Sequence, residues 1–273
     1  MIVINEGNNL DTLIVMYGTV AEAREVDVRG SKTRDIRDLA VELHMGEAPV
    51  ITNFTARKMN LTYAKQEMLW YLRADKYDDS IEQYATMWKK LKQPGGFYYS
   101  NYGQYLFFGA ESSQFMYVVE TLLRDPNSRR ASMVLLNREH LFSENTDLVC
   151  TYAINFHISD GALHMTVMMR SNDVIYGFTN DAFCFSCLYE LMYGVLRRYL
   201  SSLNRGTYTH FTNSMHVYER HFDMIERVVD EGVDAYTPAE VPVLDPDEAF
   251  EVVMSNGAFV GPPGSWSYWL NEV

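Results

Sequence analysis

The chain has 273 residues and a formal net charge of −13 at pH 7, from 23 Lys and Arg against 36 Asp and Glu. A hydrophobic content of 47% and an aromatic content of 14% exclude a disordered chain, and the acidic balance argues against a protein that binds nucleic acid through a basic face. Three cysteines cannot all pair and no apolar run approaches the ~18 residues of a membrane span, so we expect a cytoplasmic protein with no disulfide framework and no membrane partner.

Hydrophobic periodicity predicts helices and strands in mixed order. Helices are expected at residues 13–23, 61–73, 81–91, 112–123, 181–200 and 222–229. Strands are expected at residues 131–136, 149–158, 162–169 and 207–215, with Asp160-Gly161 in a hairpin turn between the second and the third. The charged segment 24–37 is expected to hold a loop at residues 30–33. The helix at 181–200 is apolar on most sides, which indicates that it is buried.

This order of elements favours an α+β fold over a regular βαβ alternation. No internal repeat divides the chain, so we predict a single domain over residues 1–273. Five of the eight prolines follow Tyr236, and this composition predicts an irregular C-terminal tail at residues 236–273.

Four clusters of residues could carry chemistry. They are the pair Arg129-Arg130, the lone Cys150, the stretch from Arg170 to Asp181, and His216-Val-Tyr218. Each has an ordinary structural explanation. A double arginine is usually solvated, a strand cysteine is usually a small core residue, and Asp181 could cap the helix that follows it.

The order and spacing of these clusters resemble the thymidylate synthase family. That family has a catalytic Cys after a double arginine, then R-S-x-D with a Gly four residues past the Asp, then H-x-Y. The resemblance extends upstream to Glu67-Met-Leu-Trp70, Trp88 and Tyr102-Gly103. It implies a thymidylate synthase-like fold, with a mixed and mainly antiparallel sheet flanked by helices, and a homodimer that packs sheet to sheet.

Within the family, the chain is more similar to the phage enzymes that hydroxymethylate deoxycytidylate. Thymidylate synthases carry Asn four residues past the Gly, where this chain has Asp181. An Asn amide matches the uracil edge, whereas cytosine offers an N4 amino donor and an N3 acceptor. A carboxyl group can accept from N4 and share a proton with N3. One unpaired buried polar group costs about 1–3 kcal/mol, which is enough to set the choice of base.

The resemblance implies a role for each matched residue. Cys150 would attack C6 of the pyrimidine, and C5 would take a one-carbon unit from the co-substrate 5,10-methylenetetrahydrofolate. Tyr102 would help to remove the C5 proton, while Glu67 and Asp181 would act at the base edge. The 5′-phosphate would be held by Arg170 and Ser171, with Arg129 and Arg130 donated by the partner subunit.

The remaining candidates would contact the sugar, the base or the folate. His216 and Tyr218 would hold the 3′-hydroxyl, and Asn155 would bind substrate in place of the Gln that is usual in the family. The candidate folate contacts are Trp88, Asp173 and Gly177. The family's basic residue in an early phosphate loop has no direct match, and Arg29, one place away, is a further candidate.

Two departures, Thr151 after the nucleophile and Met169 before the R-S pair, move the chain away from true thymidylate synthases. The interpretation is therefore an enzyme that makes 5-hydroxymethyl-dCMP from dCMP, in a host cytoplasm if the source is a phage. The alternatives are a dCMP or dUMP methylase of the thymidylate synthase type and a catalytically silent nucleotide-binding relative. Cys184 and Cys187 have C-x2-C spacing but no further ligand pair, so we predict core thiols and no metal site.

Overall fold

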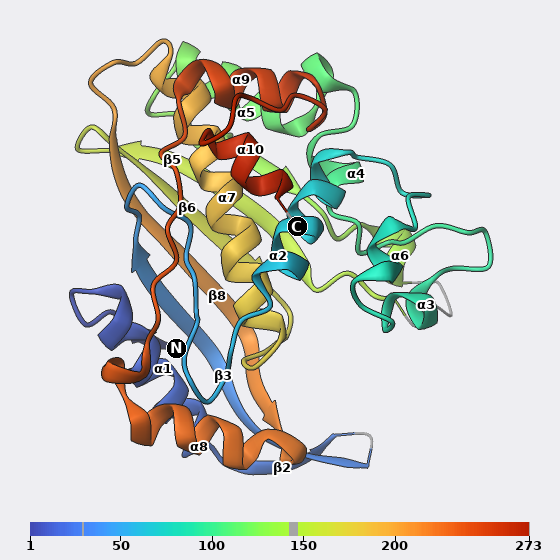
Figure 1. The fold of residues 1–273 in the computed structure, drawn as a ribbon, viewed down its shortest axis with the longest axis vertical. Helices are drawn as coiled ribbons and strands as arrows, with labels where there is room; N and C mark the ends of the chain where they lie inside the picture. The colour runs from blue at the N-terminus through green and yellow to red at the C-terminus, as the bar shows by residue number, and fades with distance from the viewer. Residues whose placement is uncertain (29, 142–146, 273) are drawn as a thin grey trace.

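The computed structural model describes residues 1–28, 30–141 and 147–272, and within them one mixed sheet forms the centre of the fold (Figure 1). The strand order is β1-β3-β8-β6-β5-β4, with β2 added to β3 and β7 added to β8. The strands are β1 (Ile2–Ile4), β2 (Glu25–Val28), β3 (Ser31–His44), β4 (Ser132–Val134), β5 (Thr151–Ser159), β6 (Ala162–Met169), β7 (Asn172–Asp173) and β8 (Asn204–Tyr218). Four of these seven pairings are antiparallel, which confirms the predicted mixed sheet.

The long strand β3 was not predicted from the sequence. It pairs antiparallel with β8 from Thr33↔Tyr218 to His44↔Thr207, so the expected loop at residues 30–33 is wrong beyond Gly30. Gly30 alone forms part of the turn between β2 and β3, with a φ of 76°. The first half of β3 is charged and partly exposed, and buried apolar residues gather only from Leu39 to Leu43. Strand geometry in the charged half is imposed by pairing with β8 rather than by its own pattern.

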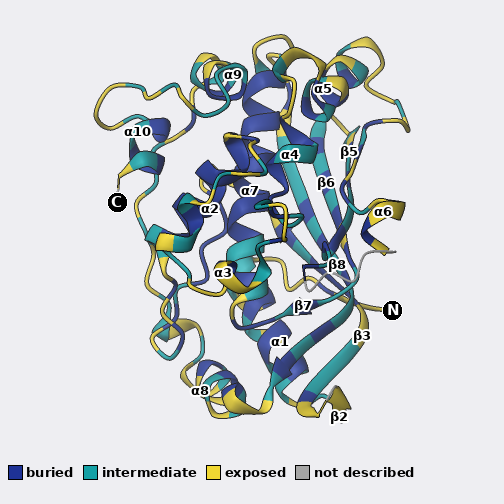
Figure 2. Cartoon of the chain, turned by 90° about the vertical axis from the view of Figure 1, so that its right-hand side faces the viewer, coloured by how far each residue is buried: buried dark blue, intermediate teal, exposed yellow. Residues whose placement is uncertain are grey.

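The helices cover one face of this sheet (Figures 1 and 2). They are α1 (Asn9–Ala21), α2 (Leu61–Leu72), α3 (Trp88–Leu91), α4 (Gly103–Leu106), α5 (Gln114–Arg124), α6 (Arg138–Leu141), α7 (Gly177–Arg197), α8 (Phe222–Glu231), α9 (Pro246–Met254) and α10 (Trp266–Asn271). The central one, α7, is buried along most of its length, as predicted. Its Phe178 ring packs against His210 and its Phe185 ring against Tyr208, so these β8 side chains point to the covered face.

The opposite face of the sheet carries the alternate residues of β5 and β6. In β6, Leu163, Met165 and Val167 are buried, whereas His164 and Thr166 between them are half-buried. The His164 ring stacks on that of His157 in β5, with centroids 4.9 Å apart. We call this side the open face.

Two further predictions differ from the structure. The predicted helix 81–91 is broken into a short 3-10 turn (Ser80–Gln83) and α3. The predicted irregular tail at 236–273 contains α9 and α10, so that prediction is wrong. Asp245 caps α9 by accepting from the backbone N–H groups of Asp247 and Glu248, and a proline at the first helical position is compatible with a helix. The prolines therefore begin a helix rather than prevent one.

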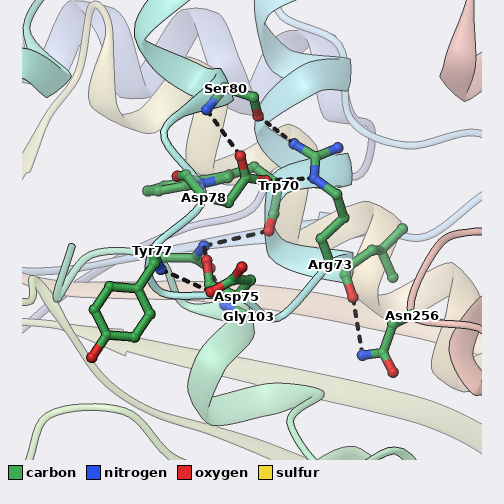
Figure 3. A network of polar contacts seen from close by, with 10 residues as sticks. Trp70, Arg73, Asp75, Tyr77, Asp78, Ser80, Gly103 and Asn256 are labelled. Atoms are coloured by element: carbon green, nitrogen blue, oxygen red, sulfur yellow. Dashed lines mark hydrogen bonds and ion pairs between the residues drawn. The ribbon is translucent and has the colours of Figure 1, made fainter. Parts of the chain in front are cut away.

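The segment after α2 is held by a polar network (Figure 3). Arg73 donates to the Asp78 carboxylate over 2.6 Å and to the Ser80 hydroxyl over 2.8 Å. The Trp70 indole N–H donates to the Asp78 carbonyl over 2.7 Å. These bonds fix the chain as it leaves α2, the helix that carries Glu67. In the part of the chain that the structure describes, no helix combines the length and hydropathy needed to cross a bilayer.

Candidate active site

The site is organised around Cys150, which immediately precedes β5. Arg170 follows the last residue of β6, and its backbone N–H donates to the Cys150 carbonyl over 2.8 Å. The Arg170 guanidinium lies 3.2 Å from the Cys150 Sγ and also donates to the Leu148 and Val149 carbonyls. Because β5 and β6 are paired, the Arg170 guanidinium lies next to the Cys150 thiol.

The Cys150 thiol is half-buried, and its surroundings oppose ionisation. Burial raises its pKa to about 11, the nearby Arg170 opposes this rise, and the carboxyls of Asp181 and Asp147 add to it. Neutralising either carboxyl would therefore favour the thiolate, which is the nucleophilic form.

Glu67 projects from α2 and is buried, with only 6% of its surface exposed. The Tyr71 hydroxyl donates to Glu67 Oε1 over 3.1 Å, and Oε2 is buried without a partner among the described residues. Burial and the nearby Asp181 carboxyl raise the pKa of Glu67 to about 8. At neutral pH this group holds a proton that it can donate.

Asp181 lies one turn inside α7 rather than at its start, so the expected helix-capping role is wrong. Its Oδ2 accepts from the Asn172 amide over 2.8 Å. Burial raises the pKa of Asp181 to about 7, while the bond from Asn172 lowers it. The buried Glu67 and the half-buried Asp181 are thus neighbouring carboxyls whose pKa values are both raised toward neutral pH.

Tyr102 is brought to the site by its neighbour Gly103. A Cβ at Gly103 would lie 1.7 Å from the Tyr71 carbonyl oxygen, so only glycine permits this approach to α2. The Gly103 N–H donates to Asn101, which in turn donates to the Asp75 carbonyl in the turn of Figure 3. The Tyr102 ring stacks on Tyr71 with centroids 5.3 Å apart, and burial raises the pKa of its hydroxyl.

The H-x-Y residues lie at the end of β8, beside β7. Asp173 pairs in register with His216, and the Val174 N–H donates to the His216 carbonyl over 2.8 Å. The His216 Nδ1 is buried and has no hydrogen-bond partner within residues 1–28, 30–141 and 147–272. The Tyr218 ring lies beside that of His216, with centroids 5.1 Å apart. Ser171 connects Arg170 to this pair of strands.

Three predicted substrate contacts lie apart from the thiol. Arg129 and Arg130 are exposed in the loop between α5 and β4. Asn155 is half-buried on the open face, where its amide lies 3.9 Å from the Met168 sulfur. This chain does not bring these three to its own Cys150, and their contacts with substrate stay predictions. Arg29 lies outside the described residues.

The predicted folate contacts are packed within the protein. Trp88 is only 4% exposed, donates to the Tyr63 hydroxyl over 3.1 Å and packs against Trp70. Asp173 accepts from the backbone N–H groups of Ile175 and Tyr176. A Cβ at Gly177 would lie 2.7 Å from the Asn172 Oδ1, which explains the glycine there by close packing.

Sequence reasoning missed two groups behind Asp181. Asn172 lies within the R-S-x-D motif, yet its side chain was not assigned a role. His210 shows no ligand spacing, although its position two residues after Tyr208 in a strand puts both side chains on one face. The structure brings Asn172 and His210 together, with 3.3 Å between Nδ2 and Nε2.

Two further features carry no chemistry that we can assign. A hollow of about 580 Å³ beside the turn of Figure 3 is lined by Arg73, Asp78 and Asn256, among others. Its one cation, Arg73, already pairs with Asp78, so we assign it no ligand. Cys184 and Cys187 are buried core thiols, as predicted, and no cluster of three metal-ligating side chains occurs among the described residues.

Comparison with known proteins gives relatives of several specificities. The profile of the thymidylate synthase family matches residues 8–251. The deoxycytidylate 5-hydroxymethyltransferase of Enterobacteria phage T4 is 29% identical over 182 residues, covering 62% of this chain and 71% of that protein. The deoxyuridylate hydroxymethyltransferase of Bacillus phage SP01 is 25% identical over 279 residues, covering 95% and 68%. The thymidylate synthase of Bacillus atrophaeus is 27% identical over 191 residues, covering 66% and 79%.

Proposed function

Because the chain belongs to the thymidylate synthase family, whose members transfer one carbon to C5 of a pyrimidine nucleotide, we propose that it converts dCMP to 5-hydroxymethyl-dCMP. The observation that carries the choice of base is the buried carboxyl of Asp181 next to Glu67, in place of the amide of the synthases. Similarity to phage proteins supports a phage origin and action in the cytoplasm of the host.

Cys150 is the nucleophile in this proposal. Its thiolate forms a bond to C6, and the electrons of the C5–C6 double bond move to C5, which becomes a carbon nucleophile. The Arg170 guanidinium, 3.2 Å from the sulfur, offsets the unfavourable burial of the thiolate. The same cation has further N–H donors for the 5′-phosphate.

The two carboxyls hold the base edge. Protonated Asp181 would donate to N3 of cytosine while its other oxygen accepts from the N4 amino group. With Asp181 neutral, one of the charges that raise the pKa of Cys150 is gone, so binding of cytosine and activation of the thiol support each other. Glu67, with its unpartnered Oε2, would relay protons to this edge, and Tyr102 would assist removal of the C5 proton.

5,10-Methylenetetrahydrofolate supplies the carbon, at the oxidation level of formaldehyde. Buried polar atoms without partners are a reason to expect a polar ligand, and Glu67 Oε2 provides one such atom on the side of α2. By resemblance to the family we assign the pterin contacts to Asp173, Gly177 and Trp88, although Trp88 is only 4% exposed here. After loss of the C5 proton, tetrahydrofolate would leave the transferred carbon; water, rather than hydride, would then add to that carbon while the Cys150–C6 bond breaks, which gives the hydroxymethyl group and frees the thiolate.

The nucleotide's sugar and phosphate would be held by two copies of the chain. His216 Nδ1 and Tyr218 would bind the 3′-hydroxyl, and Ser171 would join Arg170 at the phosphate. Arg129 and Arg130 are exposed and remote from their own thiol, which fits donation to a second protomer packed on the open face. Asn155 lies on that face and would act at the same interface.

The deciding experiment incubates the purified protein with dCMP and methylenetetrahydrofolate and determines the product mass. We expect 5-hydroxymethyl-dCMP, tritium release from C5-labelled dCMP, and tetrahydrofolate as the folate product. Turnover of dUMP alone would contradict the assignment of Asp181. Formation of dihydrofolate would instead identify a methylase, because hydride transfer oxidises the folate.

A second candidate is hydroxymethylation or methylation of dUMP. The relative matched over 95% of this chain acts on deoxyuridylate by its name, and this coverage favours the candidate. Parallel assays with the two nucleotides distinguish them. If the wild-type protein forms a product that Cys150→Ala does not form, the chain is not a catalytically silent relative.

A further inference from the structure

A chain of polar side chains lies behind Asp181, on the covered face of the sheet. Asn172 Nδ2 lies 2.8 Å from Asp181 Oδ2, 3.3 Å from His210 Nε2 and 3.1 Å from the Met169 sulfur. The other His210 nitrogen, Nδ1, lies 2.6 Å from the Tyr208 hydroxyl. His210 is fully buried, and burial lowers its pKa to about 3, so the ring is neutral and carries one N–H.

One arrangement of hydrogens is consistent with these contacts of Nδ2, while Asn172 Oδ1 is buried without a hydrogen-bond partner among the described residues. The Asn172 NH2 group has two hydrogens, one for Asp181 Oδ2 and one for His210 Nε2. Nε2 must then be the acceptor, so the ring hydrogen is on Nδ1 and is donated to the Tyr208 oxygen. The opposite tautomer would place an N–H of His210 against the N–H of Asn172, which is repulsive.

We propose that His210 is a positioning residue that holds the Asn172 amide with its nitrogen toward Asp181, and thereby confines the Asp181 proton to Oδ1. This inference rests on the proposed function only for its consequence in catalysis. A flipped Asn172 would present Oδ1 to Asp181 and stabilise the protonated carboxyl, but the same flip would place that oxygen against the Nε2 lone pair. His210 therefore penalises the flip.

The consequence concerns which oxygen of Asp181 meets which atom of the base. Oδ2 already accepts from Asn172 and can accept once more, from an amino group. Oδ1 is left to carry the proton toward a ring nitrogen. The cytosine edge, with one donor beside one acceptor, matches this division of roles.

Other charged or titratable groups also face Asp181. They come from α2, from the chain beside α4 and β5, from α7 itself and from β8: Glu67, Tyr71, Tyr102, Cys150, Cys184, Tyr208 and His210. Glu67 titrates close to Asp181, so an experiment must separate the two carboxyls.

The test is an infrared titration of the free protein, without substrate. The C=O stretch of protonated Asp181 is assigned by its loss in Asp181→Asn, which separates it from Glu67. Wild type should half-titrate near pH 7. In His210→Phe, which keeps a ring between Phe178 and Phe185, the midpoint should move upward by about one pH unit, because the flipped amide becomes available. If His210→Phe does not fold, His210→Leu takes its place.

Asn172→Ala should raise the midpoint as well, because it removes the donor to the charged form. The double variant should match Asn172→Ala alone, since His210 acts only through Asn172. Tyr189→Phe, which removes a buried hydroxyl that bonds the Leu163 carbonyl, controls for a loss of stability and should leave the midpoint unchanged.

An unchanged midpoint in the His210 variant, or additive shifts in the double variant, would overturn the inference. The pH profile of kcat/KM for dCMP should move in parallel with the infrared midpoint. If wild type does not turn over dCMP, the proposed function fails while the infrared titration still tests the role of His210.

Discussion

Polar side chains on the two faces of the central sheet lie in different environments, buried on one face and partly accessible on the other. On the covered face, Asp181 belongs to α7 and His210 packs against Phe178 of the same helix, and desolvation moves both pKa values far from their usual range. On the open face, Asn155 and the stacked pair His157 and His164 stay partly accessible, and Met168 is 38% exposed. The candidate catalytic carboxyls, whose pKa values lie near neutral pH, are therefore on the face where burial, rather than solvent, sets proton affinity.

The largest expected effect is on the covered face, at the nucleophile. Cys150→Ala should lower kcat for tritium release by a factor on the order of 10⁴ or more, because no other group can form the bond to C6. The free energy of unfolding should change little, since the thiol is only half-buried. Cys187→Ala is the matched control. It should keep full activity and lower the free energy of unfolding by about 1 kcal/mol.

Asp181→Asn should change the preferred base rather than abolish activity. An amide donates to O4 of uracil and accepts from N3–H, so the ratio of kcat/KM for dCMP to that for dUMP should fall by about 10- to 100-fold. Steady-state tritium release from both nucleotides measures the ratio. Equal losses on both substrates would mean that Asp181 does not read the base.

We expect nucleotide binding to require Arg129 from a second copy of the chain, packed on the open face. Arg129→Ala should raise KM for the nucleotide by about 10- to 100-fold, because one charge-assisted bond to phosphate is lost. Mixing it with Cys150→Ala should restore about a quarter of the wild-type sites, since each mixed dimer holds one complete site. No recovery in the mixture would show that each protomer uses its own arginines.

Parts of the fold and of the candidate site differed in how far they could be predicted from the sequence. Cys150 and Arg170 were proposed as site residues from the motif resemblance, and their proximity could be predicted because apolar alternation indicates the two strands beside which they lie. Strand β3 could not, because half of it is charged and its geometry comes from pairing with β8. The contact between Asn172 and His210 joins residues 38 positions apart across two strands, and no local pattern encodes it.

The buried carboxyls also make a prediction about stability. Glu67 has a folded pKa near 8 and an ordinary value of 4.5, so between these the native state holds a proton that the unfolded chain has lost. Its contribution to the free energy of unfolding is therefore present at low pH and falls as pH rises from 4.5 to 8, by at most about 1.4 kcal/mol per pH unit. Glu67→Gln should flatten this slope in urea unfolding measured from pH 5 to 8. An unchanged slope would mean that a group other than Glu67 causes the pH dependence of stability.

The smallest expected effect has the opposite sign and belongs to the open face. Burial and the adjacent His164 lower the pKa of His157 below its usual 6.5, so the unfolded chain binds a proton more readily than the native one. The contribution of His157 to the free energy of unfolding should therefore rise with pH up to about 6.5 and then level off. His157→Gln should flatten this rise without changing the fall above pH 7 that Glu67 produces, and urea unfolding between pH 4.5 and 6.5 measures it. Since His157 is exposed, the change in the free energy of unfolding should be slight. If His157→Gln instead altered the fall in stability above pH 7, the two faces would be coupled through the sheet.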